Sequence, residues 1–354
     1  MRIIDITIFS YKAKYIHGTY TMSGGRSADG WAETSPLGSD YLPSFFEGEL
    51  AALKKLSEHV LGLDPRLPAV VNAAMDRVLL SNPAAKAVLD CACWDLYGKA
   101  VGLPTHVLLG GAVTPEMPDF KVVGVGDAQA SVKHALAEVD KGVRVLQLKI
   151  GDNPVADARR AKAVSEAVPH DVVILADANA GWNLSQALTF VHELGQNAAK
   201  VILEQPCPRL KECAEVARRS CTPVILDECI FTVADLVEAH AAGITGFNLK
   251  LSRVGGITKA RVMRDTAVAL GMMVTIDDTW GCSFTTVQNI QLAATTPSKY
   301  LRGIDVYAEW TSPFVADVPR VKSDGHISVT ELPGNGYSNV KLELLGDPLH
   351  QVSA

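Results

Sequence analysis

Six short apolar runs between residues 145 and 278 each end in a charged residue. Runs of this kind are typical of strands that are buried on both faces. The first charged residues after the runs are spaced by 28, 27, 23, 23 and 27 residues and are Lys149, Asp177, Glu204, Asp227, Lys250 and Asp277. A spacing of roughly 25 residues fits one strand, one helix and two short loops. The pattern therefore predicts a repeated strand–helix unit with a charge at the end of each strand.

The alternation of strand-like and helix-like segments extends from about residue 120 to residue 306. Two more strands are predicted over 120–125 and 300–306. Helices are predicted over 128–141, 154–167, 184–196, 209–219, 232–241, 257–270 and 283–294. Eight parallel strands with helices between them predict an α/β fold, a (β/α) TIM-like barrel whose chemistry lies at the carboxyl ends of the strands. An eighth helix is not evident in the sequence.

The first hundred residues follow a different, α+β pattern. Residues 3–12 and 30–34 alternate like strands, and helices are predicted over 46–62 and 83–101. The glycine-rich segment 19–27 predicts a loop, either a plain linker or a lid over a substrate.

We expect three parts in the chain. Residues 1–115 form an α+β capping domain, residues 116–320 form the catalytic barrel, and residues 321–354 form a tail that returns to the capping domain. The tail is assigned in this way because its polar and apolar residues alternate again, as they do in a strand.

Composition and charge narrow the class of protein. The chain has 354 residues, of which 48% are hydrophobic, and a net charge of −6. It has no cluster of basic residues, which argues against a nucleic-acid partner. No apolar run approaches the roughly 18 residues of a membrane span. The seven cysteines are odd in number and form no C-x-x-C pair, so we expect reduced thiols in a cytoplasmic protein.

In a barrel, the positions of the six charged residues suggest a shared chemical role. The second and sixth of eight strands lie opposite each other, so Lys149 and Lys250 should face each other across the barrel mouth. Asp177, Glu204 and Asp227 should form an arc between them. Three carboxylates without histidine favour a hard divalent cation, and Mg²⁺ is the first choice. Taken singly, each carboxylate could instead cap a helix.

The two lysines are candidate bases. A nearby divalent cation would lower their pKa values, because like charge disfavours the protonated amine. A lysine tuned in this way can act as a general base. If a carboxylate substrate binds the metal, its α-carbon lies between the two amines, and the metal stabilises the charge that develops when the α-proton leaves.

Several stretches resemble the enolase superfamily, in its muconate-lactonizing-like group. They cover nearly the whole chain and are 87–90, 94–99, 108–111, 147–151, 177–179, 204–206, 227–228 and 248–256. The resemblance implies a lysine base with Mg²⁺ and an oligomer built from copies of the chain. The group usually has K-x-K at the end of the second strand, where this chain has Gln147 followed by the catalytic Lys149. No histidine ends the sixth or seventh strand, which argues against the mandelate-racemase arrangement.

Within the group, the stretches 35–38, 250–256 and 277–281 resemble enzymes that act on proline derivatives. These enzymes are dehydratases of cis-3-hydroxy-L-proline and 2-epimerases of hydroxyproline betaines. The betaine enzymes set an aromatic ring against a quaternary ammonium near the eighth strand. This chain has two carboxylates, Asp305 and Glu309, in that region. Carboxylates suit a secondary ammonium, so the resemblance favours the dehydratase over the epimerase.

This chain departs from the family in one region of the N-terminal domain. The family's N-terminal domain has a longer strand region between the glycine-rich segment and the Gly30–Glu33 turn. Here Ser27 runs almost directly into Gly30, which predicts that a strand is missing from the capping sheet.

The remaining candidates are expected to contact a small-molecule substrate, a proline derivative. They are Asn179, Glu228, Asp278, Trp280, Tyr20 and Asp305. Four of them have an alternative role. Asn179 and Asp278 could cap helices, Glu228 could support a metal ligand, and Trp280 could belong to the core. A third hypothesis for the whole chain is a barrel that binds metal without catalysis.

Overall fold

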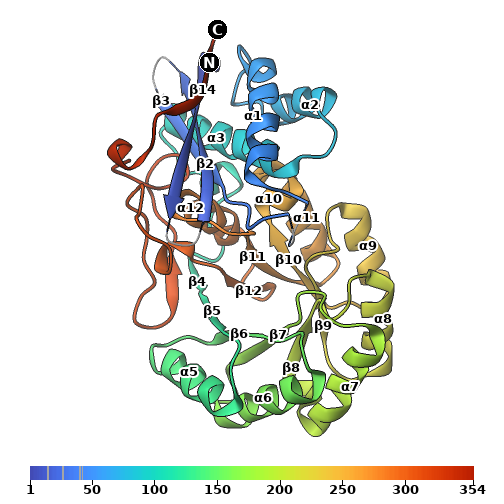
Figure 1. The fold of residues 1–354 in the computed structure, drawn as a ribbon. Coiled ribbons are helices and arrows are strands. Elements are labelled where there is room, and N and C mark those ends of the chain that lie inside the picture. Colours follow the sequence, from blue (N-terminus) through green and yellow to red (C-terminus); the bar gives the residue numbers. More distant parts are fainter. Residues whose placement is uncertain (14–15, 26–27, 40, 42) are drawn as a thin grey trace.

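The computed structural model describes residues 1–13, 16–25, 28–39, 41 and 43–354, with the backbone alone between residues 12 and 27. Figure 1 shows a barrel with helices around it and a second part, made of a sheet and helices, that covers one end of the barrel. The two chain termini lie together in this second part, where the Ala354 amide donates to the Ile4 carbonyl.

Eight parallel strands form the barrel. Their order is β12-β11-β10-β9-β8-β7-β6-β5, and an isolated parallel bridge between Asp119 and Ile304 joins the last strand to the first. The strands are β5 (Phe120–Val123), β6 (Val145–Lys149), β7 (Val173–Asp177), β8 (Val201–Glu204), β9 (Val224–Leu226), β10 (Gly246–Lys250), β11 (Met273–Asp277) and β12 (Leu301–Ile304). The predicted α/β barrel is confirmed.

The helices between the strands lie on the outside of the barrel (Figure 1). They are α5 (Ala128–Asp140), α6 (Pro154–Ala167), α7 (Leu184–Leu194), α8 (Leu210–Arg219), α9 (Val233–Ala241), α11 (Ile257–Ala269) and α12 (Ser283–Ala294), with the shorter η1 (Gly195–Lys200) and α10 (Leu251–Val254). After β12, the described chain has only the single turn η2 (Tyr307–Glu309) where an eighth helix would follow. Each predicted helix is present to within two residues at its ends.

Alternation along the strands explains why the strand-end charges converge. Successive side chains of a strand point to opposite faces. On β6, Leu146 and Leu148 pack in the large core shared with the outer helices. Val145 belongs to a small separate cluster with Leu175 of β7. Lys149 is four residues after Val145, so it shares the inner face and points into the barrel mouth.

The capping part contains a four-stranded sheet in the order β14-β1-β2-β3. Its elements are β1 (Asp5–Ala13), β2 (Ile16–Gly25), β3 (Ala28–Thr34), α1 (Phe46–Val60), α2 (Pro68–Val78), α3 (Pro83–Val101), α4 (Thr105–Leu108) and β14 (Pro348–Ser353). The helix expected over 83–101 has these bounds in the structure, and Pro83 occupies its first turn, where the lost N–H has no helical partner in any case.

Two predictions for the capping sheet are wrong. The glycine-rich segment was expected to form a loop, and a strand was expected to be missing. Instead β2 pairs with β1 from Ile16 to Gly24 and with β3 from Thr19 to Gly25. Gly25 pairs with Ala28, so only two residues separate the paired positions of β2 and β3. The capping sheet therefore keeps the strand that was expected to be missing.

The C-terminal tail adds one strand to the capping sheet. The strand β13 (His326–Ser328) pairs with β4 (Glu116–Pro118), and after the turn η3 (Leu342–Leu344) β14 pairs with β1. None of the helices that the structure describes is long and apolar enough to cross a membrane.

The helix α3 joins the capping part to the barrel. Asp90 accepts hydrogen bonds from the Thr258 amide and hydroxyl, at 2.9 and 2.6 Å, and Trp94 Nε1 donates to the same hydroxyl. Gly256 has φ +101°, and a Cβ there would lie 2.5 Å from Asp90 Oδ2. Glycine is therefore required at this close approach, which places α3 directly behind the end of β10.

Candidate active site

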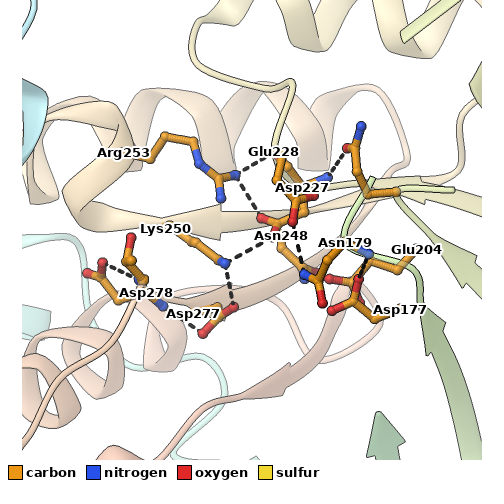
Figure 2. Close-up of polar contacts among 12 residues, drawn as sticks. Asp177, Asn179, Glu204, Asp227, Glu228, Asn248, Lys250, Arg253, Asp277 and Asp278 are labelled. Atoms are coloured by element: carbon orange, nitrogen blue, oxygen red, sulfur yellow. Dashed lines mark hydrogen bonds and ion pairs between the residues drawn. The ribbon is translucent and has the colours of Figure 1, made fainter. Parts of the chain in front are cut away.

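The charged ends of neighbouring strands lie in register. Lys149 of β6 pairs with Asp177 of β7, which pairs with Glu204 of β8. On the other side of the barrel, Lys250 of β10 pairs with Asp277 of β11. Figure 2 shows the charged side chains at the ends of β7, β8, β10 and β11 converging in one space. The lysines of β6 and β10 lie on opposite sides, with three strands between them.

Lys149 is held by a carboxylate and an amide. Its Nζ lies 2.5 Å from Asp177 Oδ2 and donates to Asn179 Oδ1 at 3.3 Å. Burial would lower the pKa of the Lys149 amine, but the negative charges of Asp177 and Glu204 outweigh burial and raise it. The lower pKa predicted for this lysine depends on the charge of a bound cation.

Lys250 is more deeply buried and has three partners. Its Nζ lies 2.9 Å from Asp227 Oδ2 and 3.6 Å from Asp277 Oδ2. It also donates to the Tyr41 hydroxyl at 3.2 Å. Burial opposes the charge of this amine, but Asp227 and the other anionic neighbours raise its pKa well above the usual value. Tyr41 comes from the segment between β3 and α1, so the capping part reaches the lysine directly.

Glu204 sits at the centre of the arc of carboxylates. Its Oε2 accepts from Gln147 Nε2 at 3.0 Å, and its Oε1 accepts from Asn248 Nδ2. Burial raises the pKa of Glu204 well above the usual value, and the charges of Asp177 and Asp227 raise it further. The three carboxylates therefore repel one another, and a bound cation would relieve that repulsion.

Asp227 is fixed at every polar atom. The Gln205 side chain accepts from its amide at 2.8 Å. Arg253 Nη1 donates to its carbonyl oxygen and, at 2.7 Å, to its Oδ1, while Lys250 contacts Oδ2. Burial opposes the charge of the carboxylate, but Arg253 and Lys250 lower its pKa to about 2. Figure 2 shows Arg253 and Lys250 approaching this carboxylate.

The donor set fits a divalent cation in its chemistry. Asp177, Glu204 and Asp227 present carboxylate oxygens from the ends of neighbouring strands, and oxygen is the donor that Mg²⁺ prefers. Within the described residues, no three acidic, histidine or cysteine side chains already form a metal cage. Lysines and amides hold the carboxylate oxygens instead. A cation bound here would compete with the two lysines for the carboxylate oxygens of Asp177 and Asp227.

Asn179 and Glu228 lie where the sequence predicts, next to the lysines and carboxylates. Asn179 Nδ2 donates to Glu228 Oε1 at 2.9 Å, and the Tyr41 hydroxyl donates to the same oxygen at 3.4 Å. Burial raises the pKa of Glu228 to about 7, and the charges of Asp227 and Asp177 add to this effect. These contacts link Lys149, through Asn179, Glu228 and Tyr41, to Lys250.

The two aspartates after β11 have different roles. Asp277 is on the inner face and approaches Lys250, while its Oδ1 accepts from the Tyr307 hydroxyl at 2.7 Å. Asp278, the predicted substrate contact, accepts from the amide and hydroxyl of Ser252 and from the Thr279 amide. Burial raises the pKa of Asp278 to about 6. Its oxygen atoms join two loops, so Asp277 is better placed to meet a substrate.

Trp280 and Asp305 lie at the ends of β11 and β12. The Trp280 ring centroid is 5.2 Å from that of Trp310 and 6.2 Å from that of Tyr307. Asp305 is buried, and its Oδ1 accepts no hydrogen bond from the described chain. Burial and the charge of Asp277 raise the pKa of Asp305 well above the usual value. The Tyr20 side chain lies outside the part of the chain that the structure describes.

The structure adds residues that the sequence did not single out. Tyr41 and Arg253 contact Lys250 and Asp227, and Asn248 contacts Glu204. The sequence positions of Asn248 and Arg253 are consistent with these contacts. Asn248 is two residues before Lys250 and so lies on the same face of the strand, and Arg253 is three residues after Lys250 and so lies on the same side of a helical turn. Tyr41 has no such signal, since it is 209 residues from its partner.

Comparison with known families places the chain in a class that this barrel and carboxylate arc already suggest. Residues 130–339 match the enolase C-terminal domain-like family, and residues 24–110 match the N-terminal domain of mandelate racemase and muconate lactonizing enzyme. The chain therefore belongs to the enolase superfamily and is an enzyme of it.

The chain is also similar to individual members of the superfamily. The chain is 32% identical over 370 aligned residues to cis-3-hydroxy-L-proline dehydratase of Roseibium aggregatum, with 100% of both chains covered. It is 31% identical over 60% of its length, and 60% of the relative's, to a hydrophobic dipeptide epimerase of Enterococcus faecalis. A Roseovarius nubinhibens mandelate racemase/muconate lactonizing enzyme homologue, solved with magnesium, superposes with a TM-score of 0.96 at 29% identity over 100% of both chains.

Proposed function

We propose that this enzyme is a magnesium-dependent lyase that removes the α-proton of a cyclic amino acid, cis-3-hydroxy-L-proline or a close relative, and expels its 3-hydroxyl group. The observation that carries the proposal is the pair of lysines on opposite barrel strands, each beside one of the arc carboxylates. The similarity over the full length to a cis-3-hydroxy-L-proline dehydratase supports the choice of substrate.

The carboxylates of Asp177, Glu204 and Asp227 would hold the Mg²⁺ ion. When bound there, the ion supplies positive charge that favours neutral lysines and offsets the negative charge developing on the substrate carboxylate. Gln147 and Asn248 hold Glu204 from within the barrel, and Arg253 holds Asp227. These contacts do not involve the lysines, so they keep the ligands in place when the amines are released.

The lysines carry the proton transfer. Either Lys149 or Lys250, once neutral, accepts the proton from C2 of a substrate placed between them. The electron pair of the broken C2–H bond forms a C2–C3 double bond, and the C3–O bond breaks. The departing hydroxide takes a proton from a protonated lysine and leaves as water, so the product is a pyrroline carboxylate. Lys250 is also held by Tyr41, which fixes the amine from the capping side.

The acidic residues at the ends of β11 and β12 would bind the substrate nitrogen. Asp305 Oδ1 is a buried acceptor that no described group satisfies, and Asp277 Oδ2 faces Lys250. A secondary ammonium can donate two hydrogen bonds, and a pair of carboxylates is a suitable acceptor for them.

The proposal is tested by incubating the protein and Mg²⁺ with cis-3-hydroxy-L-proline in D₂O. We expect a pyrroline carboxylate and one equivalent of water lost. The same experiment with L-proline, 4-hydroxyproline and the betaines of these compounds defines the substrate. Recovery of unchanged cis-3-hydroxy-L-proline, with its C2 proton intact, would contradict the proposal.

A second candidate is a 2-epimerase or racemase of a proline derivative or proline betaine. It is favoured by the ring contacts of Trp280, Tyr307 and Trp310, since aromatic faces attract a quaternary ammonium. One lysine would remove the α-proton and the other would return a proton to the opposite face. In D₂O this reaction yields the C2 epimer with deuterium at C2 and loses no water.

A third candidate is a barrel that binds metal without catalysis. The three hypotheses differ in the effect of Lys149→Ala. In this third case the variant leaves all activity and α-proton exchange unchanged, and a large loss in the variant would eliminate the hypothesis.

A further inference from the structure

A second cavity lies between the capping part and the barrel. Its volume is about 700 Å³, within the range of small-molecule sites. Capping residues from the end of β3, the start of α1 and the start of α3 form one wall. The loops after β9, β10 and β11 form the other. The arc carboxylates and the two lysines are not among the residues that line it. The cavity therefore adjoins the candidate active site through Arg253 and Ser252 but does not include the space between the lysines.

Arg253 lines this cavity with one edge of its guanidinium unused. Its Nη1 donates to Asp227, whereas its Nε and Nη2 are buried and make no hydrogen bond within the described chain. Elsewhere in this protein, two arginines use the same Nε–Nη2 edge to bind a carboxylate: Arg66 binds Asp64 and Arg218 binds Glu215. This edge matches the two oxygen atoms of a carboxylate. Leaving two buried donors unpaired is costly, so the edge favours a ligand that pairs them.

The rest of the lining defines the body of the ligand. Most of it is apolar and includes Leu37, Phe45, Leu80 and Val254. The buried Glu49 carboxyl on the capping wall would repel a second negative charge. The two lysines of the lining, Lys86 and Lys259, do not offset this effect, because both form ion pairs with Asp76. The chemistry therefore fits a molecule with one carboxylate and an apolar body.

We propose that this cavity is a second ligand-binding site, which takes a small monocarboxylic acid with an apolar body on the Nε–Nη2 edge of Arg253. Both nitrogen atoms are shielded from water, so a side chain must move to admit the carboxylate. Phe231 is 40% exposed, and its ring centroid lies 6.0 Å from Arg253 Cζ. It is the side chain that we expect to move.

The site is coupled to the arc of carboxylates because one guanidinium serves both. A carboxylate on the free edge adds negative charge beside Asp227, which Arg253 holds on the other edge. Nearby negative charge favours the binding of a cation, and the coupling is reciprocal. This consequence rests on the proposed Mg²⁺ site, but occupation of the cavity does not.

The test uses the metal-free full-length protein, titrated calorimetrically with benzoate and with benzamide. The two probes share a shape, and only benzoate carries the charge. We expect benzoate to bind at least about tenfold more tightly, as expected for hydrogen bonds to a charged group. Gly48→Leu adds a side chain to the cavity next to the Phe45 ring and should abolish binding without changing turnover. Its thermal transition is measured to show that the variant is folded.

Three results would overturn the proposal. They are the absence of benzoate binding, equal affinity for benzamide, and benzoate binding that survives Gly48→Leu in the folded variant. In a second titration, saturating benzoate should tighten Mg²⁺ binding by about fivefold in the wild type and leave it unchanged in Gly48→Leu. Mg²⁺ binding that does not respond in the wild type would contradict the link through Arg253, and absence of Mg²⁺ binding would contradict the proposed function instead.

Discussion

Lys250 and Asp277 occupy directly opposed positions in the register of β10 and β11, and Lys250 Nζ lies 3.6 Å from Asp277 Oδ2. Asp278, one residue further on, instead joins the loops that carry Ser252 and Thr279. Two adjacent aspartates of the same chemistry therefore have different neighbours, because successive residues at a strand end point to opposite faces.

This difference gives a matched pair of variants. Asp277→Asn should lower kcat/KM about 10- to 100-fold, because it removes a buried charge that faces the lysine and the proposed substrate nitrogen. Asp278→Asn should lower the free energy of unfolding by about 1 kcal/mol and leave kcat/KM near the wild-type value. Steady-state kinetics and chemical denaturation of both variants check this, and the reverse order of effects would contradict the assignment.

Arg253 holds the carboxylate of Asp227, so the loss of Arg253 should affect metal binding. Arg253→Met should weaken Mg²⁺ binding about 10- to 100-fold, as is usual when a group that orients a metal ligand is lost. The control is Arg264→Met, since Arg264 is also buried but contacts Thr295 and Thr296 away from the site. Calorimetric titration with Mg²⁺ measures both. Equal affinities for the two variants would show that Arg253 does not position the ligand.

The contact between Tyr41 and Lys250 predicts that the capping part influences catalysis. Tyr41→Phe keeps the ring beside Lys250 but removes the hydroxyl that contacts both Lys250 and Glu228. We expect kcat to fall about tenfold, because a hydrogen bond to a charged group is lost. Tyr300→Phe, outside the site, should leave kcat unchanged. A wild-type kcat in Tyr41→Phe would mean that the contact with Lys250 has no catalytic role.

Burial of Glu49 predicts how stability depends on pH. Burial raises the pKa of its carboxyl from 4.5 to about 7. Between these values the folded state holds more protons than the unfolded state, so the free energy of unfolding falls as pH rises from about 4.5 to about 7. The loss from this group is on the order of 3 kcal/mol and is complete above pH 7.

Glu49→Gln isolates this contribution, since other buried acids also titrate. The variant should be more stable than the wild type at pH 8 and no more stable at pH 4. Denaturant unfolding at both pH values measures the difference. A stability difference that does not change with pH would contradict the raised pKa.

The barrel and its charged centre could be predicted because both follow from local pattern. An apolar run that ends in a charge predicts a strand end, and the spacing from Lys149 to Lys250 predicts which ends face each other. The alternation of side chains along β11 also distinguishes Asp277 from Asp278, because Asp277 is two residues after Thr275 and shares its face of the strand. These parts depend on contacts within or between neighbouring repeat units.

The capping part was harder to predict because its contacts are long-range. The glycine-rich segment resembles a loop, and only pairing with β1 and β3 makes it a strand. Tyr41 reaches Lys250 from a segment without a strong pattern, and the unused edge of Arg253 depends on how α1 and α3 pack over the barrel loops. Folding of the two parts against each other decides these features, and neither part encodes them alone.

The central claim is that two opposed lysines beside the carboxylate arc exchange the α-proton of a cyclic amino acid. The most direct test is the rate of C2 proton loss from cis-3-hydroxy-L-proline in D₂O with Mg²⁺, followed by proton NMR for the wild type, Lys149→Met and Lys250→Met. We predict rapid loss with the wild type and a decrease of at least about 100-fold in one or both variants. Loss of the C2 proton at the wild-type rate in both variants would contradict the account.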